Sequence, residues 1–162
     1  MSTGTVALPA SKDVRDMLTG LVGKPVAVNP GAPVTPAPGK PVAVAVYVDP
    51  QMAINALCVM DLGASAYTAA ALALLPPGGA QDAVEEDKEL SPMLLEALHE
   101  VVNVLSALFN TPGAPHSKLN KLVADGEEIP GDVVGMLAGF NRLDLVLEVP
   151  GYGKGGLSLV LP

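Results

Sequence analysis

The stretch SPMLLEALHEVVNVLSALFN, residues 91–110, is the clearest structural element in the sequence. Ser91 is a good helix-capping residue, Pro92 suits the first helical position, and Pro112 lies just beyond the other end. At about 100° per residue, the large apolar side chains fill one broad arc of a helix and the polar ones fill the opposite arc. We therefore predict a helix that packs on a core and exposes a polar ridge. This ridge consists of Glu96, His99, Glu100, Asn103, Ser106, Ala107 and Asn110.

Strand patterns surround this helix in the sequence. Residues 41–48 alternate valine with smaller residues, and residues 53–62 form a second apolar run. The turn signal at Asp49 predicts that these two runs form a hairpin. Residues 141–150 alternate leucine with more polar residues, and residues 157–162 are the predicted hairpin partner. Strands interrupted by a block of helices predict an α+β fold, a single domain in which an antiparallel sheet packs against helices.

Shorter patterns complete the prediction. Residues 11–23 form a helix for which Ser11 is the N-cap, and residues 63–75 form another. Prolines make residues 29–41 an exposed loop of extended, polyproline-like character. The acidic segment 80–90 is interpreted as a solvated linker or a first helical turn. The remaining segments are two short strands at 24–30 and 117–125, an irregular connection at 128–139, and a flexible N-terminus at 1–9 that leaves the domain at 10–162.

The charge balance limits the classes of partner. The chain has 17 acidic and nine basic residues, and its formal net charge is −8. Phosphate contacts need lysine and arginine, and the nine are scattered, so we expect neither a nucleic acid nor an anionic membrane as partner. A protein with basic residues around its docking site is compatible with this charge. With no signal-peptide pattern and no apolar run near the roughly 20 residues of a membrane span, we expect a cytoplasmic protein.

Several kinds of chemistry find little support in the sequence. The single cysteine, Cys58, lies in an apolar run and is predicted to be a buried core residue. Neither histidine has the context of a nucleophilic triad, and there is no phosphate-binding loop. Glu96, His99, Glu100 and Asn103 share a helix face and could gather a metal, but one helix rarely supplies enough ligands. We therefore predict no metal site.

Glu100 and Asn103 offer a different chemistry. They are one turn apart near the middle of the ridge, so their head groups can converge on one point. A carboxamide can hold a water because it donates and accepts hydrogen bonds at once. A water held in line with a phosphorus atom suits hydrolysis, since phosphoryl transfer depends on positioning and charge. A nearby carboxylate can pair with a lysine of a partner that holds the phosphoryl group.

The sequence EVVN at residues 100–103 resembles the E-x-x-N signature of the CheC/CheX/FliY phosphatases of bacterial chemotaxis. The order of elements is also similar to that family, from the helix at 11–23 to the closing hairpin at 143–162. The resemblance covers roughly residues 10–162. A single E-x-x-N motif is more similar to the CheX branch, and implies a CheX-like α+β domain.

The resemblance implies roles for the ridge residues. In that family the glutamate pairs with a conserved lysine of the response regulator, and the asparagine positions the water that attacks the phosphoaspartate. Glu100 and Asn103 would take these two catalytic roles here. Glu96, His99 and Ala107 on the same ridge would contact the partner. The metal would be carried by the phosphorylated receiver domain, so this chain would need no cofactor of its own.

Two further expectations follow from the resemblance. Relatives of the CheX kind pair through their sheets, which makes a homodimer the expected assembly. The alternative to a phosphatase is a non-catalytic binding or adaptor domain of a chemotaxis or two-component pathway, which keeps the fold and the acidic ridge.

Overall fold

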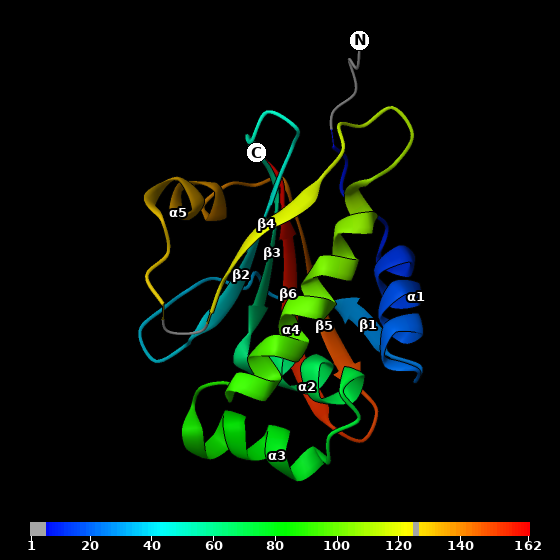
Figure 1. Ribbon diagram of the computed structural model, residues 1–162, viewed down its shortest axis with the longest axis vertical. Helices are drawn as coiled ribbons and strands as arrows, with labels where there is room; N and C mark the ends of the chain where they lie inside the picture. The colour runs from blue at the N-terminus through cyan, green and yellow to red at the C-terminus, as the bar shows by residue number, and fades with distance from the viewer. Residues whose placement is uncertain (1–5, 125–126) are drawn as a thin grey trace.

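A computed structural model describes residues 6–124 and 127–162, and its centre is a six-stranded sheet (Figure 1). The strand order is β1-β5-β6-β3-β2-β4, and every neighbouring pair is antiparallel. The strands are β1 (Ala27–Pro30), β2 (Val42–Val48), β3 (Ile54–Asp61), β4 (Lys118–Val123), β5 (Arg142–Val149) and β6 (Gly153–Val160). The helices are α1 (Ser11–Val22), α2 (Leu62–Leu72), α3 (Pro77–Asp82), α4 (Pro92–Leu105) and α5 (Gly131–Leu137). A π-helical turn, η1 (Ala83–Asp87), follows α3, and a 3₁₀ turn, η2 (Ser106–Phe109), follows α4.

The predicted α+β architecture and both predicted hairpins are confirmed. β2 pairs with β3, and the Asp49 side chain closes their turn by accepting hydrogen bonds from the amides of Gln51 (2.9 Å) and Ala53 (3.0 Å). β5 pairs with β6 along its whole length. β1 contains a proline and lies at an edge of the sheet. Proline has no backbone N–H to donate to a neighbouring strand, and an edge strand has only one neighbour.

Different helices pack against the two faces of the sheet. On the face that carries α1, α2 and α4 (Figure 1), β2 contributes Ala43, Ala45 and Tyr47 to the main core. Because the two alanines are small, helices can approach the sheet closely, and α2 itself is mostly alanine. On the other face the valines of β2 form a second apolar cluster, which Val133 of α5 completes. The alternation of side chains along β2 therefore builds both layers.

Several local predictions are wrong. Residues 131–137 are the helix α5, not irregular, because burial of Val133 and Leu137 on the second cluster stabilises a segment whose glycines hide the helical pattern. The N-cap of α1 is Ala10, and Ser11 is already helical. The acidic segment 80–90, predicted as a linker or a first helical turn, is mostly helical, since it holds the end of α3 and all of η1, but it ends before α4 begins.

The proline-rich loop is exposed along most of its length but is anchored to the sheet at its start, where the Gly31 amide donates to the Asp144 carbonyl (3.1 Å), and again at Val34. Val34 is buried, and its amide donates a hydrogen bond to the Ser158 hydroxyl (2.9 Å). Of the predicted flexible N-terminus, residues 1–5 lie outside the described residues, whereas Val6 and Leu8 pack against the main core.

The segment Pro92–Phe109 meets the length and composition expected of a membrane span. Most of its large apolar side chains lie inside the main core, with exceptions that include the exposed Met93 and the half-buried Leu95, and its polar ridge faces outward. The core helix of a soluble protein passes the same test.

Candidate functional site

The rotation of α4 is fixed by its start and by its buried face. The Ser91 hydroxyl accepts a hydrogen bond from the Leu94 amide (3.2 Å), and Pro92 occupies the first turn, as predicted. The buried side chains of α4 are Leu94, Leu98, Val101, Val102 and Leu105. Since residues three and four apart share a helix face, burial of this set leaves the ridge facing solvent.

The far end of α4 is tied to the sheet by Tyr47 of β2. The Tyr47 hydroxyl donates a hydrogen bond to the Val102 carbonyl (2.6 Å), and its ring lies 5.3 Å from the ring of Phe109. In a regular α-helix the Val102 carbonyl would accept a hydrogen bond from the Ser106 amide, four residues later. Here the Ser106 amide bonds to the Asn103 carbonyl instead, because the helix tightens into η2, and the Val102 carbonyl is left for Tyr47. Burial raises the pKa of Tyr47 well above its ordinary value, so the hydroxyl keeps its proton. The backbone next to Asn103 is thus held in place.

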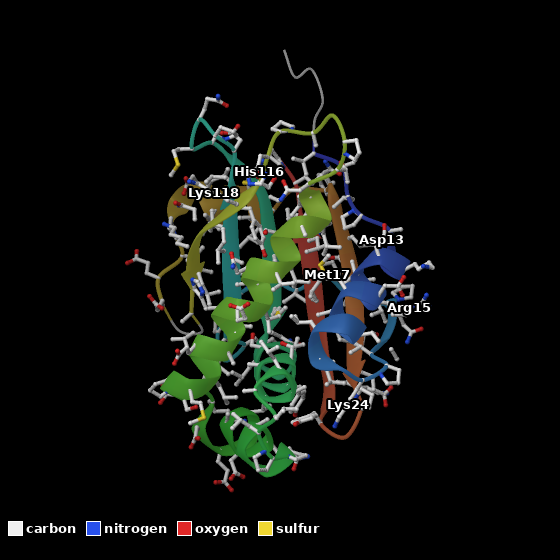
Figure 2. All side chains as sticks on the ribbon, turned by 45° about the vertical axis from the view of Figure 1, so that its right-hand side comes forward. Asp13, Arg15, Met17, Lys24, His116 and Lys118 are labelled. Atoms are coloured by element: carbon white, nitrogen blue, oxygen red, sulfur yellow. The ribbon has the colours of Figure 1, made fainter. Side chains whose placement is uncertain are left out.

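Asn110 joins the end of η2 to the start of β4. Its side-chain oxygen accepts from the Ser117 amide (2.6 Å), and its side-chain nitrogen donates to the Ser117 carbonyl (2.9 Å). Figure 2 shows β4 beginning near His116 and Lys118, with α4 crossing the sheet between β4 and α1. This clamp fixes the spacing between α4 and the edge strand.

Glu100 and Asn103 lie side by side on the exposed ridge of α4, as their spacing predicts. Both side chains are exposed. Residues three apart on a helix have Cβ atoms about 5–6 Å apart. Within the described part of the chain, neither head group has a hydrogen-bond or ion-pair partner. The Asn103 backbone carbonyl, in contrast, accepts from both the amide and the hydroxyl of Ser106, the latter at 2.7 Å. The protein therefore leaves this carboxylate and this carboxamide free for another molecule.

A groove of about 600 Å³ runs beside the ridge, between α4 and the end of β4. Three glutamates and a histidine lie along it, and the remaining lining is apolar or backbone. Its lining residues are Pro92, Leu95, Glu96, His99, Glu100, Leu122, Ala124 and Glu127. The groove is therefore acidic, and it complements a basic group on a partner.

The structure brings together most of the predicted site residues. Glu96, His99 and Glu100 line the acidic groove. Asn103 lies on the next turn of the ridge, beyond the lining of the groove, and Ala107 is exposed on η2. These positions agree with a surface that a partner could cover, whereas the roles of the residues stay predictions.

Sequence reasoning missed one wall of the groove. Glu127 and Leu122 come from the segment after α4 and meet its first half only through the fold. Glu127 is held by its own loop, since its carboxylate accepts from the Ala124 amide (3.1 Å). In the sequence, the neighbouring glutamates Glu127 and Glu128 could have indicated an acidic surface. Nothing in their spacing shows that this surface lies beside α4.

Two other kinds of site considered from the sequence involve metal ligands and the single cysteine. Among the described residues, no group of three or more histidine, cysteine, aspartate or glutamate side chains is placed to hold a metal. Cys58 is buried, as predicted, and burial raises the pKa of its thiol to about 12. Since the thiolate is the reactive form, Cys58 is a poor nucleophile.

Comparison with known proteins finds similarity in structure but not in sequence. No protein-family model matches the chain, and no curated protein matches its sequence. A chain of the H. pylori FliM–SpeE complex is similar to it with a TM-score of 0.61 at 10% identity, over 94% of this chain and 81% of that one.

Two further solved structures share the fold. FliY of Thermotoga maritima has a TM-score of 0.56 at 14% identity, over 98% of this chain and 85% of that one. A chain of the CheX–CheY–BeF₃–Mg complex of Borrelia burgdorferi has a TM-score of 0.52 at 13% identity, over 90% of this chain and 90% of that one. The predicted fold, that of the CheC/CheX/FliY group, is confirmed, and FliM middle domains share it.

Proposed function

We propose that this protein is a CheX-like phosphatase that removes the phosphoryl group from an aspartate of a phosphorylated receiver domain. The observation that carries the proposal is the free Glu100–Asn103 pair on a firmly anchored helix. Both side chains are polar and exposed, and no residue that the structure describes uses their head groups, which is what a site completed by a second protein requires. The proposal includes a cytoplasmic location and no cofactor belonging to this chain.

Asn103 would act on the water. Its carboxamide oxygen accepts a hydrogen bond from the water while its nitrogen can donate to the phosphoryl group. The water oxygen then bonds to phosphorus as the bond from phosphorus to the aspartate oxygen breaks. The products are a free aspartate and inorganic phosphate. The partner would supply the phosphoaspartate, its metal and the charge that stabilises the transition state.

Glu100 would hold the partner in register. Its carboxylate lies at the edge of the acidic groove, where Glu96 and Glu127 add negative charge. A lysine of the receiver that enters this groove would pair with Glu100 and place the phosphoryl group over Asn103. His99 and Ala107 would lie within the same covered surface.

The direct test follows the phosphate. A receiver domain from the same organism would be phosphorylated with a small-molecule donor, and its dephosphorylation followed with and without this protein. We expect a rate well above that of autohydrolysis, and a large loss in both Asn103→Ala and Glu100→Ala. Asn29→Ala and Glu148→Ala are matched controls, since both residues are exposed on β1 and β5, at the other edge of the sheet. Equal acceleration by Asn103→Ala and the wild type would refute the catalytic role.

The alternative is a non-catalytic binding domain of the same fold. It is favoured by the similarity to FliM middle domains, one of which forms a complex with FliG. This reading predicts receiver binding without faster dephosphorylation, and weaker binding when Glu96 and Glu100 are both changed to lysine. A homodimer is also part of the proposal, and a light-scattering mass of one chain at high concentration would exclude it.

A further inference from the structure

A second hollow, of about 630 Å³, is lined by none of the residues of α4. Its walls come from the proline-rich loop, the start of α2, the end of the acidic segment and strands β5 and β6. These segments are far apart in the sequence, so the fold alone creates the hollow. It has no part in the function proposed for Glu100 and Asn103.

Three lysines line this hollow: Lys40, Lys88 and Lys154. The chain has a net charge of −8, yet the only acidic residue in the lining is Asp61. Both oxygens of Asp61 are used by backbone amides, those of Ala64 and Gly156, each at 2.8 Å. Among the described residues the three lysines have no ion-pair partner, because the ion pairs involve other basic side chains. The lining itself therefore carries three positive charges against one negative charge, with further acidic residues nearby at Glu148, opposite Lys154, and in η1, before Lys88.

The floor of the hollow is rigid because two glycines let the backbones of α2 and β6 touch. A Cβ atom on Gly155 would lie 2.1 Å from the Ala64 nitrogen, and one on Gly63 would lie 2.9 Å from the Lys154 carbonyl oxygen. Any larger residue at Gly155 would push the strand away from the helix. This contact fixes the backbone that carries Lys154.

The other two lysines are also presented by defined backbone. Lys40 closes a turn in which its amide donates to the Ala37 carbonyl (2.9 Å). Lys88 has a left-handed backbone (φ 57°) that ends η1. Val34, buried under the loop, keeps this side of the hollow attached to the sheet.

Size and chemistry together indicate the ligand. Pockets for small molecules measure about 300–1,000 Å³ and combine apolar walls with a few polar groups. Here Val34, Val42, Leu62, Val84 and Val146 supply the apolar walls. Lysine ammonium groups are compact charges on flexible stems, and several of them can surround a phosphate as point charges. We infer that this hollow binds a small organic phosphate, with the phosphate among the three lysines and the organic part on the valines.

Two probes test the inference on the intact protein. ATP and hexyl phosphate, without added metal, would be titrated while amide NMR signals are followed. We expect saturable binding tighter than about 1 mM for at least one probe, with the largest shifts at Gly63, Gly155 and Gly156. Binding should weaken as salt is added, because the charges are exposed. No saturable binding of either probe would overturn the inference.

Two matched triple variants separate a site from general charge. Changing Lys40, Lys88 and Lys154 together to glutamine should weaken binding at least about 10-fold, the loss of charged contacts to a phosphate. The control changes three exposed lysines elsewhere, Lys12, Lys118 and Lys121, and alters the net charge equally. Equal weakening in both triples would overturn the inference.

A last arm distinguishes the source of the phosphate. Vesicles of phosphatidylglycerol present the same anion on a membrane surface. If the protein sediments with these vesicles but binds neither soluble probe, the phosphate belongs to a lipid headgroup and the inference of a small soluble ligand is wrong. A loss of soluble-probe binding only in the first triple, with no sedimentation, supports it.

Discussion

The two faces of α4 have opposite relations to the rest of the chain. The inner face is buried from Leu94 to Leu105 and receives a hydrogen bond from Tyr47. The outer face holds Glu100 and Asn103, whose head groups have no partner in the described chain. A helix whose inner face is this well fixed can carry outer side chains that serve another molecule. The difference predicts that substitutions on the inner face change stability, and that those on the outer face change function alone.

The largest effect is expected from Leu98→Ala. Leu98 is fully buried in the main core, and truncation of a buried leucine leaves a cavity. We expect the free energy of unfolding to fall by about 3 kcal/mol, measured by urea denaturation. Glu96→Ala, on the outer face of the same helix, is the control and should change it by less than about 0.5 kcal/mol. Similar losses in the two variants would contradict the division between the faces.

Asn103→Ala should show the opposite behaviour. Its stability should match the wild type within about 0.5 kcal/mol, since the side chain is exposed and its head group bonds to none of the residues at 6–124 and 127–162. If the proposed function is correct, dephosphorylation of the receiver should slow about 100-fold, equivalent to about 2.7 kcal/mol on the barrier. Circular dichroism melting and phosphate release would be measured on one preparation. A destabilised Asn103→Ala would show that the outer face also supports the fold.

Features of this fold that depend on residues close together in the sequence could be predicted, whereas features that depend on residues far apart in the sequence could not. The inner and outer arcs of α4 were predictable because helical periodicity is local, and the hairpins because Asp49 and the tight turn after β5 are local signals. α5 was missed because its helix depends on burial of Val133 and Leu137 against distant strands. The last turn of α4 tightens into η2, where Tyr47 takes up the released carbonyl, and such a contact has no sequence pattern.

The candidate site divides in the same way. Glu96, His99 and Glu100 were found because they repeat at helical spacing on one face. Glu127 was missed because β4 and its following loop reach α4 only through sheet order, with β4 at the edge beside β2. The lysine-lined hollow could not be predicted from the sequence at all, since its three lysines come from three separate segments that only the fold brings together.

A smaller effect is expected at the contact between the sheet and the inner face. Tyr47→Phe keeps the ring but leaves the buried Val102 carbonyl without its donor. We expect a loss of about 1–2 kcal/mol in the free energy of unfolding. Tyr67→Phe is the control, because the Tyr67 hydroxyl makes no hydrogen bond with any residue that the structure describes, and it should cost less than about 0.5 kcal/mol. Equal values for the two would mean that the bond to Val102 contributes nothing.

The smallest effect concerns the core beneath α4 and depends on pH. Burial raises the pKa of the Cys58 thiol from 9.0 to about 12. A group whose pKa is raised by folding stabilises the protein below its unfolded pKa, and this contribution is lost as pH rises towards the folded pKa. The free energy of unfolding should therefore fall by about 1 kcal/mol between pH 8 and pH 9.5. Cys58→Ala should remove most of this slope, while Glu100→Gln on the outer face should leave it unchanged. A slope that persists in Cys58→Ala would mean that another group of the core, and not this thiol, resists ionisation.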